Sequence, residues 1–282
     1  MTTTVSGSRP GRRLRSPVVS VVRDNVIWLA AGAALIFLLL PNVIVVVFSF
    51  NKPNGRFNYT WQRFSLDAWE HPCGAAGMCQ SLSLSLKIGV VATIAATVLG
   101  TLVAFGLGRY RFRGRSVANL LVFMPMATPE VVMGSSLLTL FVSLGLPLGQ
   151  LTILIAHIMF CLSYVVVTVK ARIASLDPRL EQAAGDLYAN EFQTFRRITL
   201  PLVAPGIAAG ALLAFSLSFD DFIVSNFNAG STSTTFPMYV WGAAQRGTPV
   251  QINVIGTAMF VVAVAAVGLG QLAASRRNRW KW

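Results

Sequence analysis

The chain has 282 residues, of which 54% are hydrophobic and 12% are charged, and its mean hydropathy is +0.63. Values this far from the soluble average exclude a soluble globular enzyme and indicate a membrane protein. The net charge of +13 does not indicate nucleic-acid binding, because the basic residues are scattered over short loops and tails with no separate basic domain.

The N-terminal region is rich in Ser, Thr, Gly and Arg, which predicts a disordered basic tail over 1–25. The apolar run that follows is too long for the h-region of a signal peptide, so we interpret it as a permanent span. A transmembrane helix needs roughly 20 mainly apolar residues. Six segments reach that length: 26–50, 81–107, 117–144, 151–171, 202–227 and 252–274. We therefore expect an all-α membrane domain over 26–274 with six transmembrane helices, followed by a basic tail over 275–282.

The distribution of Lys and Arg predicts the orientation, because cytoplasmic loops retain these residues. Most of the 23 basic residues fall in the two tails and in the loops after the second and fourth predicted spans. The exceptions are Lys52, Arg56, Arg63, Lys87 and Arg246. Both termini are therefore expected in the cytoplasm, where anionic lipid headgroups can neutralise the basic loops.

The loop over 51–80, between the first two predicted spans, is expected on the external side. It contains Cys73 and Cys79, and disulfides persist in an oxidising compartment. A disulfide-closed loop and two free thiols both stay open, whereas a metal site is disfavoured because only His71 lies nearby. Trp69 in the same loop could contact a cationic substrate through its ring or serve as an interfacial aromatic residue.

Proline and glycine interrupt several predicted spans. Pro41, Pro125, Pro129 and Gly134 lie inside apolar runs, where membrane helices tolerate them if neighbouring helices or water satisfy the freed backbone groups. Kinks at these positions suit a transport pathway better than a plain anchor. The Leu200-Pro201 pair is expected to end a short polar helix and to begin the fifth span.

A polar segment over 172–201 separates the fourth and fifth predicted spans. Asp177 can cap a first short helix with Pro178 at its first position, and Asn190 can cap a second, answered by Gln193 in a capping box. The two helices would present a small, partly apolar knob suited to a helix-in-groove contact. An amphipathic loop on the membrane surface is the alternative. The knob residues are Ala183, Ala184, Leu187, Ala189 and Phe192.

Five stretches spread over the chain form a recognisable set: RYRFRG at 109–114, PEVVM at 129–133, VVVTV at 165–169, the polar segment from residue 180, and SFDDF at 218–222. Together they resemble the permease subunits of type I, binding-protein-dependent ABC importers, and among these the polyamine (spermidine and putrescine) permeases. The resemblance covers nearly the whole chain. It implies the type I importer permease fold and a place in the bacterial inner membrane.

The same resemblance implies partners: a homologous permease subunit in a heterodimer, two ATPase subunits and an extracytoplasmic substrate-binding protein. The chain has no Gly-x-x-x-x-Gly-Lys-Ser/Thr phosphate loop, so we expect a non-catalytic subunit that binds no cofactor, with ATP and Mg held by the partner ATPase. The polar segment resembles the "EAA" loop, whose short coupling helix docks in a groove of the ATPase. The residues assigned to this docking are Glu181, Gln182, Ala183, Ala184, Asp186, Leu187, Tyr188, Ala189, Glu191, Phe192, Arg196, Leu200 and Pro201.

The polar segment departs from the family's pattern at two positions. Gln182 stands where the family has Glu, and Tyr188 stands where it usually has Gly, in the turn between the two short helices. If that turn requires a left-handed residue, Tyr188 costs roughly 1 to 2 kcal/mol. Gly185 and Asn190 are the alternative positions for such a conformation.

Three acids lie in apolar segments: Glu130 in the third predicted span, and Asp220 with Asp221 in the fifth. Each charge costs roughly 2.5 to 3.5 kcal/mol there, so something must compensate it. The remaining partners are the homologous subunit, water, protonation or a cationic substrate such as a polyamine. Neighbouring side chains point about 100° apart on a helix. We therefore expect at most one of the two aspartates to face the pathway, while the other caps, pairs or contacts the partner subunit.

Two other functions stay open. The chain could serve the same type of importer for another substrate, such as an aminophosphonate, thiamine or ferric ion. A stand-alone secondary transporter or channel is the second alternative. It predicts gradient-driven flux through the isolated chain and leaves the polar segment without a role.

Overall fold

The computed structural model describes residues 17–278, with side chains described over 26–270 and at Leu272. Helices dominate the described residues, and an isolated bridge joins Asn51 to Phe64. The chain divides into two units, which are described separately. The first comprises the described residues up to Pro72 together with those from Val250 onward, and the second runs from Cys73 to Pro249.

The first unit contains α1 (Pro17–Phe48), α2 (Asp67–Glu70) and α12 (Val250–Asn278), with α12 in contact with both of the others. α1 begins at Pro17, within the tail expected over 1–25. Residues 1–16 lie outside the described part. In the same way α12 extends to Asn278, into the tail expected over 275–282, of which 279–282 are not described.

A buried asparagine organises the loop between α1 and α2. The Asn51 side chain donates to Asn58 Oδ1 at 2.6 Å and to the Thr60 carbonyl at 2.9 Å. Trp69 stacks on Phe50 with ring centroids 5.5 Å apart, and its indole N–H donates to Ser49 Oγ at 3.3 Å. The ring of Trp69 is therefore fixed by contacts within its own unit.

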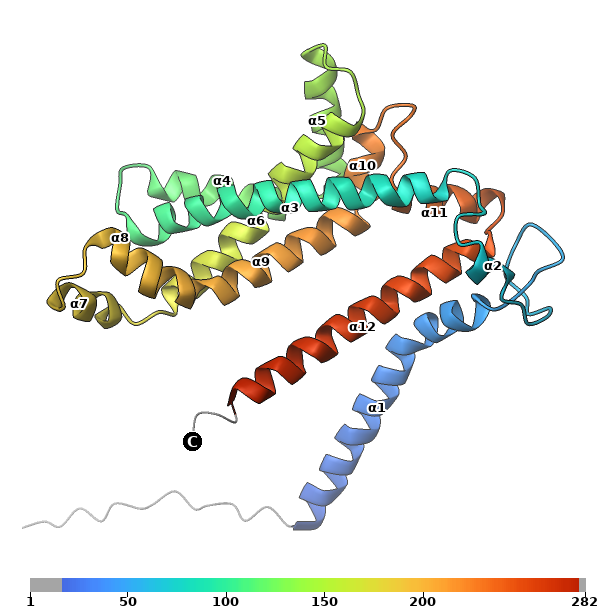
Figure 1. Cartoon of the computed structure of the whole chain (residues 1–282), viewed down its shortest axis with the longest axis horizontal. Coiled ribbons are helices and arrows are strands. Elements are labelled where there is room, and N and C mark those ends of the chain that lie inside the picture. The colour runs from blue at the N-terminus through green and yellow to red at the C-terminus, as the bar shows by residue number, and fades with distance from the viewer. Residues whose placement is uncertain (1–16, 279–282) are drawn as a thin grey trace, which may run out of the picture. The chain divides into compact units, whose positions relative to one another are not determined.

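Three long helices form the core of the second unit: α3 (Met78–Arg109), α6 (Gln150–Ala174) and α9 (Leu200–Asp220), each in contact with the other two (Figure 1). Small residues bring their backbones close together, as is usual between membrane helices. A Cβ added at Gly100 would lie 2.8 Å from Val165 Cγ1, and one at Gly210 would lie 3.5 Å from Val165 Cα. Val165 is fully buried at this crossing.

The third predicted span is not one straight helix. It consists of α4 (Arg115–Ala127) and α5 (Glu130–Ser143), which are bent by 107° at the break between them. Pro129 explains the break, because proline disfavours the helical region for the residue before it, and Thr128 accordingly takes φ −83° and ψ 131°. Over residues 17–278, five helices are long and apolar enough to cross a membrane, or six if this bent pair forms one span.

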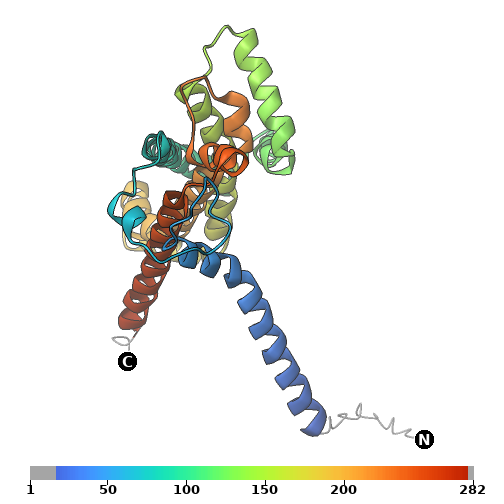
Figure 2. The same ribbon diagram turned by 90° about the vertical axis from the view of Figure 1, so that its right-hand side faces the viewer.

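Four shorter helices complete the second unit: α7 (Arg179–Asp186), α8 (Glu191–Thr194), α10 (Ile223–Asn228) and α11 (Phe236–Arg246). Figure 1 shows α7 and α8 at one end of this unit and α11 at the other. Figure 2 shows α10 beside α5, with which it packs. A Cβ added at Gly134 would lie 2.8 Å from the Phe227 ring, so glycine permits this close packing.

The predicted helix break at Leu200-Pro201 is wrong. The chain is helical from Glu191 to Asp220, through a π-helical stretch η1 (Phe195–Thr199) that leads into α9. The Leu200 N–H donates to the Phe195 carbonyl, five residues back. A proline removes a helical hydrogen bond and crowds the preceding turn, and the wider π turn accommodates Pro201 without ending the helix.

Candidate functional site

The first group of candidate residues lies at the corner between α9 and α10. Asp220 is the last residue of α9, and Asp221 turns the chain with φ −63° and ψ 124°. The fifth predicted span, 202–227, is therefore interrupted here. The Asp221 carboxylate accepts hydrogen bonds from the backbone N–H groups of Val224 at 3.2 Å and Ser225 at 2.7 Å. It thereby satisfies donors that the first turn of a helix leaves unpaired.

His157 of α6 joins this corner through a buried polar network. Its Nε2 lies 3.3 Å from Asp221 Oδ2 and 3.0 Å from Ser225 Oγ, while its Nδ1 lies 2.7 Å from Ser218 Oγ. We assign the tautomer with the proton on Nε2, because that ring can donate to the carboxylate and accept from the Ser218 hydroxyl. His157 is thus a buried, hydrogen-bonded group in the core of the second unit.

The two aspartates occupy different surroundings. Asp221 is 8% exposed and caps and pairs within the chain, whereas Asp220 is exposed. Glu130, the first residue of α5, is also exposed and follows the bend at Pro129. Trp69, the fourth residue predicted for the substrate pathway, is half-buried and belongs to the other unit. Asp220 and Glu130 are thus the two acids of this set that remain accessible.

The second group of candidate residues is the polar segment over 172–201. Both guanidinium NH2 groups of Arg109, at the end of α3, donate to the carboxylate of Glu181 in α7. The Thr199 hydroxyl donates to Glu181 Oε1 at 2.6 Å. Partial burial alone would raise the pKa of Glu181, but the hydrogen bonds from Thr199 and Arg109 and the charge of Arg109 outweigh it, so the pKa lies below its usual value. Glu181 therefore ties α7 to α3 and η1.

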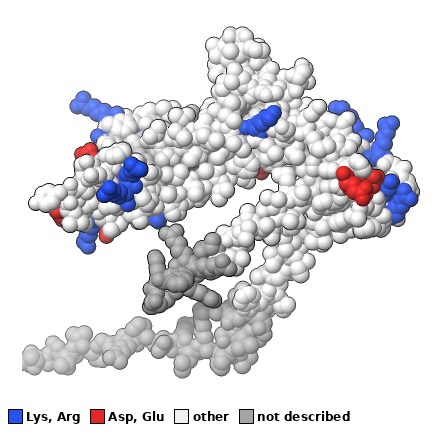
Figure 3. Space-filling model, viewed as in Figure 1, with Lys and Arg blue, Asp and Glu red and all other residues white. Residues whose placement is uncertain are grey.

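Local caps shape the two short helices. The predicted capping box is confirmed: Asn190 Oδ1 accepts from the Gln193 N–H at 2.8 Å, and Gln193 Oε1 accepts from the Asn190 N–H at 3.1 Å. Asp177 Oδ1 accepts from the Arg179 N–H at 2.9 Å, next to Pro178 at the start of α7. These contacts fix the backbone at the end of the second unit that carries α7 and α8. Figure 3 shows basic and acidic side chains gathered at this end.

The exposed tip of the segment differs from the predicted knob. Leu187, Tyr188 and Phe192 are 81%, 98% and 67% exposed, and we call these three residues the apolar tip. Ala184 is only 4% exposed and Ala189 is half-buried, so these two predicted knob residues pack inward. Ala184 instead closes the turn, because its carbonyl accepts from the Ala189 N–H at 3.0 Å.

Tyr188 takes the left-handed conformation, with φ 58°, so the turn requires this conformation at Tyr188 itself rather than at Gly185 or Asn190. Replacing Tyr188 with glycine should stabilise the turn by up to about 1 kcal/mol, because an L side chain costs roughly 1 to 2 kcal/mol there and glycine loses part of that gain in chain entropy. Amide hydrogen exchange over α7 and α8 would show this as slower exchange. Tyr188→Ala retains a Cβ and is the matched control; equal protection in the two variants would contradict the explanation.

The loop before α3 contains a disulfide between Cys73 and Cys79. Gly77 lies within the closed loop with φ 77°, a conformation open to glycine at little cost.

Two groups of contacts were not anticipated from the sequence: the hydroxyls of Ser218 and Ser225 around His157, and the pairing of Arg109 with Glu181. A signal for the first was available, since Ser218 and Asp221 stand three residues apart in an apolar run, a spacing that would place them on one face of a continuous helix.

Comparison with known protein families identifies the family to which this chain belongs. Residues 96–279 match the family described as the inner membrane component of binding-protein-dependent transport systems. The chain belongs to this family. It is accordingly a multi-pass protein of the inner membrane, consistent with its apolar helices.

Relatives and solved structures agree with the assignment. The chain is 37% identical over 242 residues to the spermidine/putrescine transport system permease protein PotC of Haemophilus influenzae, covering 86% of this chain and 93% of the relative. It is 38% identical over 239 residues to the putrescine transport system permease protein PotI of Escherichia coli K12, covering 82% and 84%. A bacterial alginate ABC transporter, solved with its alginate pentasaccharide-bound periplasmic protein, shares the fold with a TM-score of 0.67 at 16% identity, over 92% of this chain and 96% of that chain.

Proposed function

We propose that the chain is the transmembrane permease subunit of an ATP-driven importer of polyamines such as spermidine and putrescine. The relatives named for transport of these compounds cover more than four fifths of the chain. The observation that carries the substrate class is the exposed Asp220 at the end of an apolar span, with exposed Glu130 on a second element. Ammonium groups spaced along a flexible chain can pair with carboxylates that stand on separate helices.

The partners follow from the same proposal. A homologous permease subunit completes a heterodimer, an extracytoplasmic protein delivers the substrate, and two ATPase subunits bind ATP and Mg. Both termini and the polar segment face the cytoplasm, as the distribution of basic residues favours. The apolar tip of Leu187, Tyr188 and Phe192 docks in a groove of the ATPase. Closure of the ATPase pair is transmitted through α7 and α8 to the spans, which expose the pathway to each side in turn.

The Glu181 contacts suit this role. Arg109 and Thr199 hold Glu181 from two different helical elements, so a displacement of α7 is carried to the ends of α3 and α9 rather than absorbed by a loose loop. Such contiguous contacts are a physical route for coupling between sites. The segment thus acts as a stiff connection between the ATPase and the membrane helices.

Uptake of labelled spermidine and putrescine tests the proposal. Cells that lack the chain should regain energy-dependent uptake when it is restored, with expression of the other subunits verified. Restored uptake of an aminophosphonate, thiamine or ferric ion in place of polyamines would replace the substrate class and keep the permease assignment. Flux through the isolated chain, driven by a gradient alone, would overturn the coupled mechanism.

Replacing Asp220 with asparagine should reduce polyamine uptake at least about tenfold, which corresponds to a loss of roughly 1.4 kcal/mol. The side chain keeps its size and loses the charge that attracts an ammonium group. Initial uptake rates at several spermidine concentrations would measure the effect. The matched control is Glu70→Gln, which removes an exposed acid from the short helix α2. Equal uptake by the two variants, at equal expression, would show that the charge of Asp220 is not used.

A further inference from the structure

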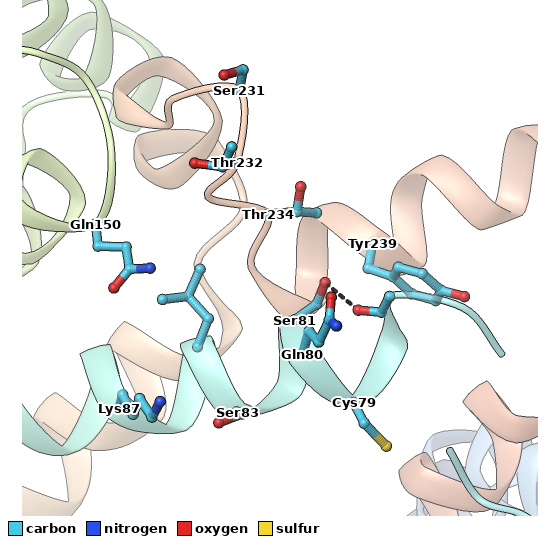
Figure 4. A pocket seen from close by; sticks show the side chains of 12 residues that line it. Cys79, Gln80, Ser81, Ser83, Lys87, Gln150, Ser231, Thr232, Thr234 and Tyr239 are labelled. Carbon is cyan, nitrogen blue, oxygen red and sulfur yellow. Dashed lines mark hydrogen bonds between the residues drawn. The ribbon is translucent and has the colours of Figure 1, made fainter. Parts of the chain in front are cut away.

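A polar pocket of about 610 Å³ lies at the start of α3 and is separate from both groups of candidate residues. Its lining residues come from three parts of the second unit, as Figure 4 shows: Gln80 and Ser83 belong to α3, Gln150 to the start of α6, and Thr232 and Thr234 to the loop between α10 and α11. Lys87, also on α3, lies at the side nearest Gln150. The pocket therefore combines one ammonium group with several hydroxyl and amide groups.

The chemistry of the walls selects an anion. Among the described residues that line the pocket there is no Asp or Glu, and Lys87 is the single charged group. A polyamine would be repelled by the ammonium of Lys87. A phosphate ester would be attracted by that charge and could accept hydrogen bonds from hydroxyl and amide donors, which are typical partners of phosphate oxygens.

An apolar groove continues from the polar pocket. It has a volume of about 310 Å³, shares Leu84, Lys87 and Gln150 with the pocket, and is otherwise lined only by aliphatic residues. These are Ile88, Val91, Leu151 and Leu154. Val91 and Leu151 at its rim are 48% and 64% exposed. Lys87 thus lies where the polar pocket, which we also call the polar chamber, meets the apolar groove.

The position of Lys87 along α3 suits a membrane interface. α3 has 32 residues, whereas about 20 residues cross the hydrocarbon, so the helix extends beyond it. Lys87 lies nine residues after Met78, or about 14 Å along the helix axis at 1.5 Å per residue. In a centred helix the hydrocarbon would begin about six residues, or roughly 9 Å, after Met78. Lys87 therefore lies about one helical turn inside that boundary, from where a lysine can extend its ammonium back toward the headgroups.

We propose that this pocket and groove form a binding site for an anionic phospholipid. The headgroup phosphate pairs with Lys87 and accepts hydrogen bonds from the polar chamber, and an acyl chain lies in the groove between α3 and α6. A free phosphate would use the chamber alone and leave the groove unfilled, so the continuity of the two cavities favours a lipid. The site is independent of the substrate and of the coupling segment.

The test uses the chain purified from membranes together with the subunits that accompany it. Native mass spectrometry would count bound phosphatidylglycerol and phosphatidylethanolamine after defined washing. Lys87→Gln should reduce retained phosphatidylglycerol about fivefold, the effect of losing roughly 1 kcal/mol of attraction per cation, and should leave phosphatidylethanolamine nearly unchanged. Arg246→Gln, which removes an exposed basic residue of α11 outside the pocket, is the matched control and should retain both lipids.

A second variant tests the cavity rather than the charge. Ser83 is exposed on α3 and lines the chamber, so Ser83→Phe should fill it and also displace phosphatidylglycerol, with unchanged thermal unfolding. Equal retention of phosphatidylglycerol by Lys87→Gln and the wild type would overturn the proposal. Displacement of phosphatidylglycerol by millimolar inorganic phosphate would overturn it as well, because the acyl chain would then add nothing. If Lys87→Gln or Ser83→Phe retained phosphatidylglycerol but no longer bound the substrate-binding protein, the pocket would be a docking site for that protein and the lipid proposal would be wrong.

Discussion

Replacing Asp221 with alanine should destabilise the protein far more than replacing its neighbour Asp220 with alanine. The Asp221 carboxylate accepts from two backbone N–H groups and lies 3.3 Å from His157 Nε2, with all of these groups buried. Removing one partner of a buried pair costs about 3 to 5 kcal/mol, since the remaining polar groups lose their acceptor without gaining water. Asp220 is exposed, so its alanine variant should change stability by about 0.5 kcal/mol or less.

Thermal unfolding of the purified complex would measure this difference. Asp221→Asn is a graded control, because the amide keeps one acceptor oxygen for the start of α10 and loses the charge facing His157. We expect its melting temperature to lie between those of the wild type and Asp221→Ala. Equal melting temperatures for Asp220→Ala and Asp221→Ala would refute the view that the corner depends on this network.

The two variants also separate stability from transport. Asp220→Asn should lose polyamine uptake with an unchanged melting temperature, because that carboxylate is exposed and is proposed to meet substrate. Asp221→Asn should lose uptake together with stability. A variant of His157 that lowers uptake only in proportion to folded protein would agree with a purely architectural role for the network.

Local sequence signals accounted for much of the fold. Apolar segments of sufficient length marked the membrane helices, and the spacing of Asn190 and Gln193 predicted the capping box that the structure contains. A kink at Pro129 was expected, and the structure has a bend of 107° there, whereas the continuous helix through Pro201 was not expected, although both are proline effects. Whether a proline breaks a helix or is absorbed depends on the backbone around it: Thr128 is extended before Pro129, whereas a π turn precedes Pro201.

The sequence predicted which residues belong to the candidate site, but it did not predict which residues they contact. Helical geometry predicted that Asp220 and Asp221 diverge. The structure has one exposed and the other paired, but the divergence arises because the chain leaves the helix at Asp221. The partners themselves lie far away in the chain: His157 is 61 residues from Ser218, and Arg109 is 72 residues from Glu181. Such pairs arise from the packing of α3, α6 and α9, which no local pattern reports. The burial of Ala184 was not predictable either, because it depends on how the turn between α7 and α8 folds back against α7.

Replacing Phe192 with aspartate should uncouple ATP hydrolysis from transport while leaving the protein folded. Phe192 is 67% exposed, so its loss should change the melting temperature little. In the docked state its ring would be buried in a groove of the ATPase, and burying a Phe side chain contributes roughly 1.5 to 3 kcal/mol. Aspartate loses that contribution and adds the cost of burying a charge. Affinity for the ATPase subunits should therefore fall by at least about tenfold.

Two control variants distinguish docking from folding. Gln182→Glu adds the same charge to the same segment at an exposed position and should retain coupling. Ala184→Asp places the charge at a position only 4% exposed, so it should lower the melting temperature and disturb α7 itself. Stimulation of ATP hydrolysis by the substrate-loaded binding protein, measured beside polyamine uptake, reports coupling directly.

The combination of results locates the coupling contact. Loss of stimulation in Phe192→Asp alone, with normal melting, identifies the apolar tip as the docking surface. Equal loss in Phe192→Asp and Gln182→Glu would mean that the segment responds to charge in general, as expected if it lies on a membrane surface of anionic lipids rather than in a groove. If the ATPase of the Phe192→Asp complex were still stimulated by the loaded binding protein, the apolar tip would not be the coupling contact. The coupling would then have to reach the membrane helices through other contacts, such as the ion pair between Glu181 and Arg109.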